Sequence, residues 1–237
     1  MDVIVVWGTP AAFAAKQATT KIPIVIGAAG DVLNTGLVSN LARPEGNITG
    51  FIALNVELEE KRLELLKDLI PRLSRVAVLT NISNPLNRVN LDVAHRAAET
   101  LSVTIEAFEV QSGRDVEGAL RKLIDARPDA ALLASDTSLL TERKLIAETM
   151  AANRIPAIYP FREYLEVGGF IAYGANLSIL FEQAAGYVDK LLQGEQLGSL
   201  PVQQATRFEV VINLKAATAL NLIIPPIVLV RANEVIE

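Results

Sequence analysis

Short runs rich in valine and isoleucine alternate with amphipathic stretches from one end of the chain to the other. An apolar run of four to eight residues predicts a buried strand, and apolar positions three and four residues apart predict a helix. Their alternation is typical of βαβ units, in which helices cover a parallel sheet. The predicted strands lie at 3–7, 24–27, 47–52, 75–80, 103–110, 129–134, 157–159, 170–173 and 208–212, and the predicted helices at 10–19, 57–69, 88–101, 116–126, 140–153, 177–192 and 214–220. The apolar run 3–7 predicts a central strand with a neighbour on each side.

Two parts of the chain resemble each other. Asp2 and Asp129 each precede a strand, a helix follows, and the Ile-Pro pairs 22–23 and 155–156 open the next strand. Either any two βαβ units would look this alike, or the chain holds two related lobes whose strand carboxyl ends meet at one cleft, where open α/β sheets bind ligands. The expected division places one lobe at 72–175, the other at 1–56 plus 195–237, and crossover helices at 57–71 and 176–194.

Composition narrows the class of partner. The 237 residues are 51% hydrophobic and carry a net charge of −5, from 22 basic and 27 acidic side chains. This balance lacks the basic excess of nucleic-acid binders and makes anionic membrane surfaces poor partners. The absence of cysteine excludes disulfides and thiolate metal sites. No apolar run approaches the roughly 20 residues of a membrane span, and residues 1–7 show no signal-peptide pattern.

The chain offers little catalytic chemistry. His95 is the one histidine, and it falls in an amphipathic stretch without a nucleophile elbow or HExxH nearby, so we expect a surface residue. The glycine-rich segment 27–31 matches neither a Walker loop nor GxGxxG. The charged residues between 57 and 62, Glu59 and Arg62 among them, predict a solvated helix face. No cofactor and no metal is expected.

Three strand ends carry polar groups that could meet a ligand. Thr9 stands at an expected N-cap with proline after it, and such a helix start either binds an anion or is simply capped. Asp136 repeats the arrangement and could cap its helix or pair with a ligand ammonium. Asp31 follows a third strand. Two acceptors and one anion site suit a zwitterion such as an amino acid, and we expect at most two aromatic residues to face it, from Tyr159, Phe161, Tyr164, Tyr173 and Trp7.

Three segments have sequences that are typical of one protein family: LARPEGNITG at 41–50, FREYLEVGG at 161–169 and FEVVINLKAATAL at 208–220. Over essentially its whole length the chain resembles the ABC transporter substrate-binding proteins that include tryptophan- and phenylalanine-type receptors. The resemblance implies an α/β fold of periplasmic-binding type I, with two doubly wound parallel-sheet lobes, crossover segments and a ligand cleft between the lobes. It implies a periplasmic or extracytoplasmic protein without catalytic activity, which captures a small molecule, an amino acid in particular, and delivers it to a membrane permease.

The resemblance also assigns ligand-binding residues. We expect Thr9 and its helix to hold a carboxylate, Asp136 or Asp31 to hold an ammonium group, and an aromatic residue to contact the ligand side chain. The full expected set is Thr9, Asp31, Asn81, Asn84, Asp136, Phe161 and Tyr173.

One departure and two alternatives accompany this interpretation. Family members normally begin with a secretion signal and further βα units, so we expect an N-terminally incomplete first lobe, which a homodimer could complete. An α/β enzyme of unknown reaction is one alternative, because a fold does not determine a function. The ligand-sensing domain of a regulator is the other, although no helix-turn-helix segment is evident. The identity of the ligand stays open.

Overall fold

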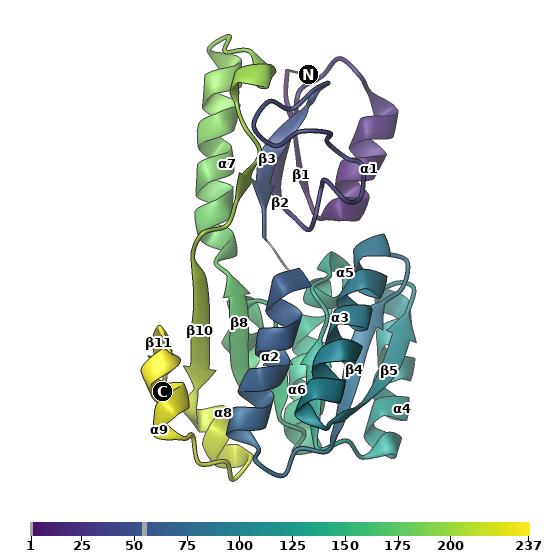
Figure 1. The fold of residues 1–237 in the computed structure, drawn as a ribbon, viewed down its shortest axis with the longest axis vertical. Coiled ribbons are helices and arrows are strands. Elements are labelled where there is room, and N and C mark those ends of the chain that lie inside the picture. Colours follow the sequence, from purple (N-terminus) through teal and green to yellow (C-terminus); the bar gives the residue numbers. More distant parts are fainter. Residues whose placement is uncertain (1, 54–55) are drawn as a thin grey trace. The chain divides into compact units, whose positions relative to one another are not determined.

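The computed structural model describes residues 2–53 and 56–237 as an α/β chain (Figure 1). The chain forms two compact units, which are described separately below. Unit 1 comprises Met1–Leu54 and Ala175–Arg207, and unit 2 comprises Asn55–Gly174 and Phe208–Glu237. The chain therefore passes from one unit to the other three times.

Unit 1 is built on a four-stranded sheet in the order β1-β2-β3-β9, in which all neighbouring strands are parallel. Ile24 and Ile26 of β2 pack with Ala12 of α1, whereas Gly27 faces Phe181 of α7, so the two helices cover opposite faces. A Cβ at Gly27 would stand 2.5 Å from the Phe181 ring, so only glycine permits this approach. The elements are β1 (Ile4–Trp7), α1 (Thr9–Ala18), β2 (Ile24–Ala29), β3 (Ile48–Ile52), α7 (Leu177–Leu192), a 3-10 turn η3 (Leu197–Ser199) and β9 (Gln203–Gln204).

Unit 2 is built on a seven-stranded sheet in the order β11-β10-β8-β7-β6-β4-β5. Its strands are β4 (Arg75–Asn81), β5 (Thr104–Val110), β6 (Ala130–Leu133), β7 (Ala157–Tyr159), β8 (Ile171–Ala175), β10 (Phe208–Asn213) and β11 (Glu234–Ile236). Its helices are α2 (Val56–Leu69), α3 (Pro85–Leu101), α4 (Val116–Ala126), α5 (Thr137–Thr141), α6 (Arg143–Ala152), α8 (Leu214–Ala219) and α9 (Pro226–Arg231), with 3-10 turns η1 (Gly113–Asp115) and η2 (Arg162–Val167).

The core of unit 2 follows from strand alternation. Val76 and Val78 of β4 face a cluster that includes Leu66 of α2 and Ala97 of α3. Ala77 lies between them in the sequence and is also fully buried, so the opposite face of the strand is covered as well. A parallel sheet buried on both faces accounts for strands that are almost continuously apolar.

The predicted elements correspond closely to the observed ones. Helices 116–126 and 177–192 coincide with α4 and α7, and each Ile-Pro pair ends directly before a strand, β2 or β7. The predicted helix 140–153 is instead two helices, α5 and α6, which meet at Glu142 with φ −89° and ψ 13°. The apolar run 227–230 lies in helix α9, because proline occupies its first turn.

The division into units differs from the expected one in three places. Helix α2, expected to be a crossover, belongs to unit 2, where Leu63 and Leu66 lie in the core. The expected first lobe included 195–237, but β10 lies beside β8 in the sheet of unit 2, where the Asn213 amide donates to Phe170 O at 2.9 Å. Strand β11 then pairs with β10, so 208–237 extends unit 2. Helix α7, expected to be a crossover, packs on the sheet of unit 1 and is part of that unit.

Strand β1 also differs from expectation. In the described part of the chain it pairs with β2 and stands at the end of the sheet order, and Val5 is 52% exposed. It is therefore an edge strand of this sheet rather than a central one. The homodimer expected through this lobe stays a prediction.

Candidate functional site

The polar groups of unit 2 gather at the carboxyl ends of β4 and β6, which are neighbours in the sheet. Asn81 is the last residue of β4, and Asn84 follows three residues later as the N-cap of α3. Asp136 follows β6 and is the N-cap of α5. Because parallel strands end at the same edge of a sheet, these loops meet there.

Asp136 is the centre of a buried hydrogen-bond network. Its Oδ1 accepts from Asn81 Nδ2 at 3.1 Å and from the Ser138 amide at 2.9 Å. Its Oδ2 accepts from Asn84 Nδ2 at 3.0 Å and from Asn87 Nδ2 at 3.3 Å. The side chain is only 4% exposed. A carboxylate has about four acceptor sites, and four donors occupy them here.

Of the two roles considered for Asp136, the structure shows one. The capping role is present, since the carboxylate accepts from Ser138 in the first turn of α5. Direct pairing with a ligand ammonium would require one of the four donors to leave. In this structure Asp136 holds the asparagine side chains in place.

The asparagines are held through their oxygens as well. Asn81 Oδ1 accepts from the Ser83 amide at 3.0 Å, and Asn84 Oδ1 accepts from the Leu86 amide at 3.2 Å. Asn87 Nδ2 also donates to Asn81 O at 3.0 Å. The loop between β4 and α3 is thus fixed on the carboxylate.

Asn87 and Asn90 are site residues that the sequence analysis missed. Both are buried on α3, and Asn90 Nδ2 donates to Asn87 Oδ1 at 3.5 Å. A signal was present: asparagines at 84, 87 and 90 are three residues apart and therefore share one face of a helix.

Several buried polar atoms near these loops have no hydrogen-bond partner among the described residues. They are Thr80 Oγ1, Asn90 Oδ1, Ser135 Oγ and Tyr164 OH. Buried polar groups are normally paired, so each of these atoms keeps an unused capacity for a hydrogen bond. Burial raises the pKa of Tyr164, and the negative charge of Asp136 adds to this.

The two aromatic residues of the expected set lie near the end of β7 and inside β8. Phe161 follows β7 and is buried at the start of η2. Tyr173 lies within β8, half-buried, and packs against the core of unit 2. Tyr159 and Tyr164 stack with their ring centroids 4.5 Å apart and are fully buried, so they belong to the core.

In unit 1, Thr9 and Asp31 lie at the carboxyl ends of β1 and β2. Thr9 is buried, and its Oγ1 accepts from the Gly30 amide at 3.3 Å. The expectation that Thr9 is the N-cap of α1 is wrong. Gly8 holds that position with φ 82° and ψ 151°, a conformation that glycine adopts easily, so the helix begins at Thr9 itself.

Asp31 organises the turn that follows β2. Its Oδ1 accepts from the amides of Leu33 at 3.0 Å and Asn34 at 2.9 Å, and its Oδ2 accepts from Asn34 Nδ2. These three donors leave one acceptor site on Oδ2. Asp31 is half-buried, so this site can be reached from solvent.

The predicted solvated face of α2 is wrong at two positions. Glu59 and Arg62 are 1% and 0% exposed and form an ion pair, with Arg62 Nη1 2.8 Å from Glu59 Oε1. Burial raises the pKa of Glu59, and the Arg62 charge opposes this. The side chain of Glu57 lies outside those that the structure describes. His95, by contrast, is exposed as predicted.

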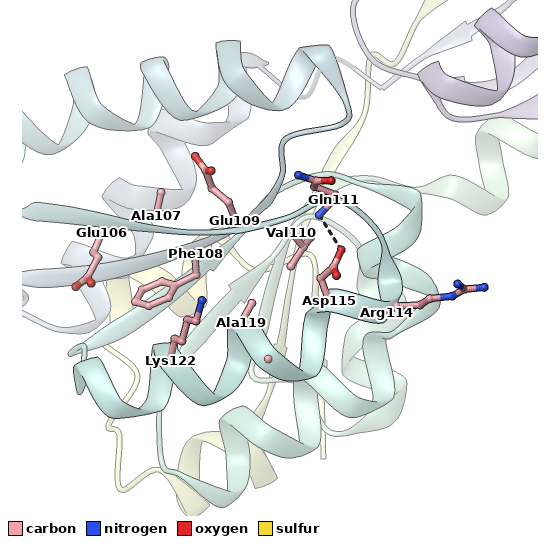
Figure 2. A pocket seen from close by; sticks show the side chains of 11 residues that line it. Glu106, Ala107, Phe108, Glu109, Val110, Gln111, Arg114, Asp115, Ala119 and Lys122 are labelled. Atoms are coloured by element: carbon pink, nitrogen blue, oxygen red, sulfur yellow. Dashed lines mark hydrogen bonds between the residues drawn. The ribbon is translucent and has the colours of Figure 1, made fainter.

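A groove of about 990 Å³ lies in unit 2 between strand β5 and helix α4 (Figure 2). Figure 2 shows Glu109 and Gln111 on the strand side and Lys122 on the helix side, with the Asp115 carboxylate accepting from the Gln111 amide at 3.1 Å. None of the seven expected site residues lines this groove. It lies along the edge strand β5, and one of its lining residues, Val110, pairs with Asn81 at the carboxyl end of β4.

Among the residues that the structure describes, no group of three or more His, Cys, Asp or Glu side chains could hold a metal ion. Within the same residues, no helix has the length and apolarity to cross a membrane.

Two α/β units with parallel sheets, joined by three passages of the chain and carrying polar groups at strand ends, define a protein of the type I periplasmic-binding fold. The predicted fold class is confirmed by solved structures with this fold. The chain belongs to the family of ABC transporter substrate binding proteins, whose model matches residues 1–236. The predicted family is therefore confirmed too.

The chain is similar to one curated protein and to two solved structures, and two of these three are named with a ligand. A tyrosine-binding protein of Clostridioides difficile (strain R20291) is 26% identical over 224 residues, which are 93% of this chain and 63% of that protein. The chain thus spans less than two thirds of the length of this relative. A Streptococcus pneumonia ABC domain in complex with L-Trp has a TM-score of 0.89 and 26% identity, covering 99% of this chain and 81% of that one. A conserved domain protein of Vibrio cholerae has a TM-score of 0.89 and 28% identity, covering 99% and 78%.

Proposed function

We propose that this protein is the solute-binding component of an ABC import system and that its ligand is an amino acid with an aromatic side chain. The observation that carries the proposal is the pair of organised carboxylates, Asp31 in unit 1 and Asp136 in unit 2, each at the carboxyl end of a parallel strand. An amino acid is a zwitterion, so it needs a negative group for its ammonium and donors for its carboxylate.

The two carboxylates have different roles in this proposal. Asp31 accepts the ammonium group, because it keeps an open acceptor site and is half-buried. Asp136 positions Asn81 and Asn84, because its own acceptor sites are occupied.

The ligand carboxylate goes to Thr9. Its hydroxyl oxygen accepts from Gly30, and its proton is free to be donated, since the described residues include no acceptor for it. The amides of Thr9 and Ala11 in the first turn of α1 add to this attraction, because the N-cap Gly8 has no side chain that could occupy them. Pro10 between them has no N–H.

An aromatic ligand is supported by two observations. Phe161, just after β7, and Tyr173, within β8, carry aromatic rings of the kind that pack against an aromatic side chain. The names of two relatives state tyrosine and L-Trp as what those proteins bind.

The remaining parts of the proposal rest on the family. A substrate-binding protein works outside the cytoplasm and hands its ligand to a membrane permease, and we propose both for this chain. We further propose that it releases the ligand chemically unchanged.

A thermal-shift titration of the full chain tests the proposal. L-Trp, L-Tyr and L-Phe are compared with L-Leu, L-Glu, glucose and benzoate at concentrations up to 100 times the Kd. A ligand at 100 Kd stabilises the folded state by about 2.7 kcal/mol. For a chain of this size that raises Tm by roughly 5–10 °C. A shift with aromatic amino acids is expected, and a cooperative melt without a shift for any amino acid would refute the proposal.

Asp31→Asn is the matching site variant. Loss of a charge-assisted hydrogen bond costs about 1.5–3 kcal/mol, so affinity should fall about tenfold or more. The Tm of the ligand-free chain should fall only slightly, because Asn34 Nδ2 loses its acceptor in a turn that water can reach. Asp125→Asn, the same change on the exposed surface of α4, is the control.

A further inference from the structure

A buried ion pair lies on α2 outside the residues assigned to the ligand. Arg62 and Glu59 are separated by three residues and are almost completely buried, with Nη1 2.8 Å from Oε1. Arg62 is among the largest fully buried side chains of the protein. Both positions lie in the first half of the helix, close to where the chain enters unit 2 at Asn55.

Arg62 connects this helix to the end of β8. Its Nε donates to the backbone oxygen of Tyr173 at 2.8 Å. The next residue, Gly174, is the last of unit 2 before the chain leaves it. A Cβ on Gly174 would stand 3.6 Å from Arg62 Nη2, so the guanidinium lies directly beside this backbone.

Gly174 in turn contacts the end of β7. A Cβ at this position would stand 1.9 Å from Pro160 O, so glycine alone permits the two backbones to approach this closely. Pro160 directly precedes Phe161. A continuous set of contacts therefore runs from Arg62 through Tyr173 and Gly174 to the segment that carries Phe161.

A contribution to stability does not explain why the Glu59–Arg62 ion pair is buried in α2. Arg62 Nη2 and Glu59 Oε2 are buried and have no hydrogen-bond partner among the described residues. A buried ion pair with unsatisfied atoms is usually less stabilising than apolar side chains of the same size. Its hydrogen bond to Tyr173 and its place beside Gly174 offer a different reason.

We propose that the Glu59–Arg62 pair is a positioning device for the aromatic end of the ligand site, which it sets by holding the backbone of Tyr173 and, through Gly174 and Pro160, that of Phe161. The inference rests on the proposed function, because it concerns affinity for an aromatic amino acid. Arg62 acts through the backbone of other residues and is a positioning residue.

Two variants of the full chain test the proposal. Glu59→Met with Arg62→Met replaces the pair by apolar side chains of similar length, and Arg62→Lys keeps a charge for Glu59 but cannot donate to Glu59 and Tyr173 O in the same way. For each, we measure the Tm of the ligand-free chain and the Kd for L-Trp and L-Tyr by isothermal titration calorimetry. Arg121→Lys is the matched control, because Arg121 pairs with Glu117 on the exposed surface of α4.

We expect both variants to melt cooperatively, with the double variant at an unchanged or higher Tm, and to bind both amino acids about tenfold more weakly than the original chain. Affinity within twofold of the original in the folded variants would overturn the proposal. Loss of the cooperative melt in both variants would also overturn it, since the pair would then serve stability. If the unsubstituted chain binds no amino acid, the proposed function itself fails, and this inference fails with it.

Discussion

Replacing Asp136 by asparagine should destabilise unit 2, because the asparagine network depends on two carboxylate oxygens. In Asp136→Asn one oxygen becomes an NH2 group. If the remaining oxygen faces Asn81 Nδ2 and the Ser138 amide, then Asn84 Nδ2 and Asn87 Nδ2 each face another donor. The opposite orientation of the amide would leave Asn81 and Ser138 without their acceptor instead, so two buried donors lose a partner in either case.

The magnitude follows from that count. A buried donor left without an acceptor costs about 1–3 kcal/mol, so two such donors cost about 2–6 kcal/mol before the loop relaxes. We expect a net loss of about 3 kcal/mol. For a chain of 150–250 residues this corresponds to a fall in Tm of roughly 6–12 °C.

Differential scanning calorimetry of the ligand-free chain measures this loss. Asp136→Ala removes the acceptor from all four donors and also the cap of α5, so its Tm should be lower still. Asp125→Asn makes the same chemical change on an exposed part of α4 and should stay within about 0.5 kcal/mol of the original chain. A Tm for Asp136→Asn within 1 °C or so of this control would refute the reasoning, because the network would then contribute nothing to stability.

Three further predictions concern stability elsewhere. Gly50→Ala should cost about 3 kcal/mol or more by urea denaturation, because Gly50 has φ +131° and a Cβ would stand 2.2 Å from a backbone oxygen of the neighbouring strand; Gly186→Ala, in open space on α7, should be neutral or stabilising. Burial raises the pKa of Glu163 from 4.5, so the contribution of the protonated Glu163 side chain to stability is present below pH 4.5 and is lost as pH rises. Glu163→Gln should therefore raise Tm at pH 7, and an equal gain in Tm at pH 4 would contradict this reasoning. The pKa of Asp115 is lowered from 3.8, chiefly by the hydrogen bond from the Gln111 backbone N–H and next by that from the Ser112 side chain. The contribution of Asp115 to stability is therefore present above pH 3.8 and is lost as pH falls, so Asp115→Asn should lower Tm at pH 7, with the difference shrinking in acid.

The sequence predicts the order and type of most elements because each strand and helix keeps its own period. Boundaries are less accurate where local hydrogen bonds extend an element. Helix α3 begins at Pro85 rather than 88, because Asn84 caps it and proline suits its first turn. The membership of β10 in unit 2 could not be read from local pattern, because pairing with β8 is a contact between distant parts of the chain.

The residues that follow the strand ends are predictable from the sequence, but their hydrogen bonding is not. Thr9, Asp31, Asn81 and Asp136 were expected because they end parallel strands, a rule that depends on chain order alone. Which carboxylate has a free acceptor site depends on the loops around it, and no spacing rule gives that.

Glu59 and Arg62 illustrate a different failure. With Leu66 and Leu69 they are spaced by three, four and three residues, so they lie on the face of α2 that is buried. Charge alone argues for a solvated position, because buried Glu and Arg are rare. Here the helical period predicts burial correctly and the charge does not. Glu59 and Arg62 can be buried because each is the ion-pair partner of the other.

The choice of asparagine around Asp136 has a consequence for charge. Asn81, Asn84 and Asn87 donate hydrogen bonds but carry no charge, and the described residues place no cationic side chain within ion-pair distance of Asp136. The carboxylate is therefore satisfied as an acceptor while its negative charge is not cancelled. A buried charge is screened less by salt than an exposed one, so it attracts a positive group without accepting a hydrogen bond from it. Within unit 2, the field of Asp136 thus favours a positively charged group over an anionic one.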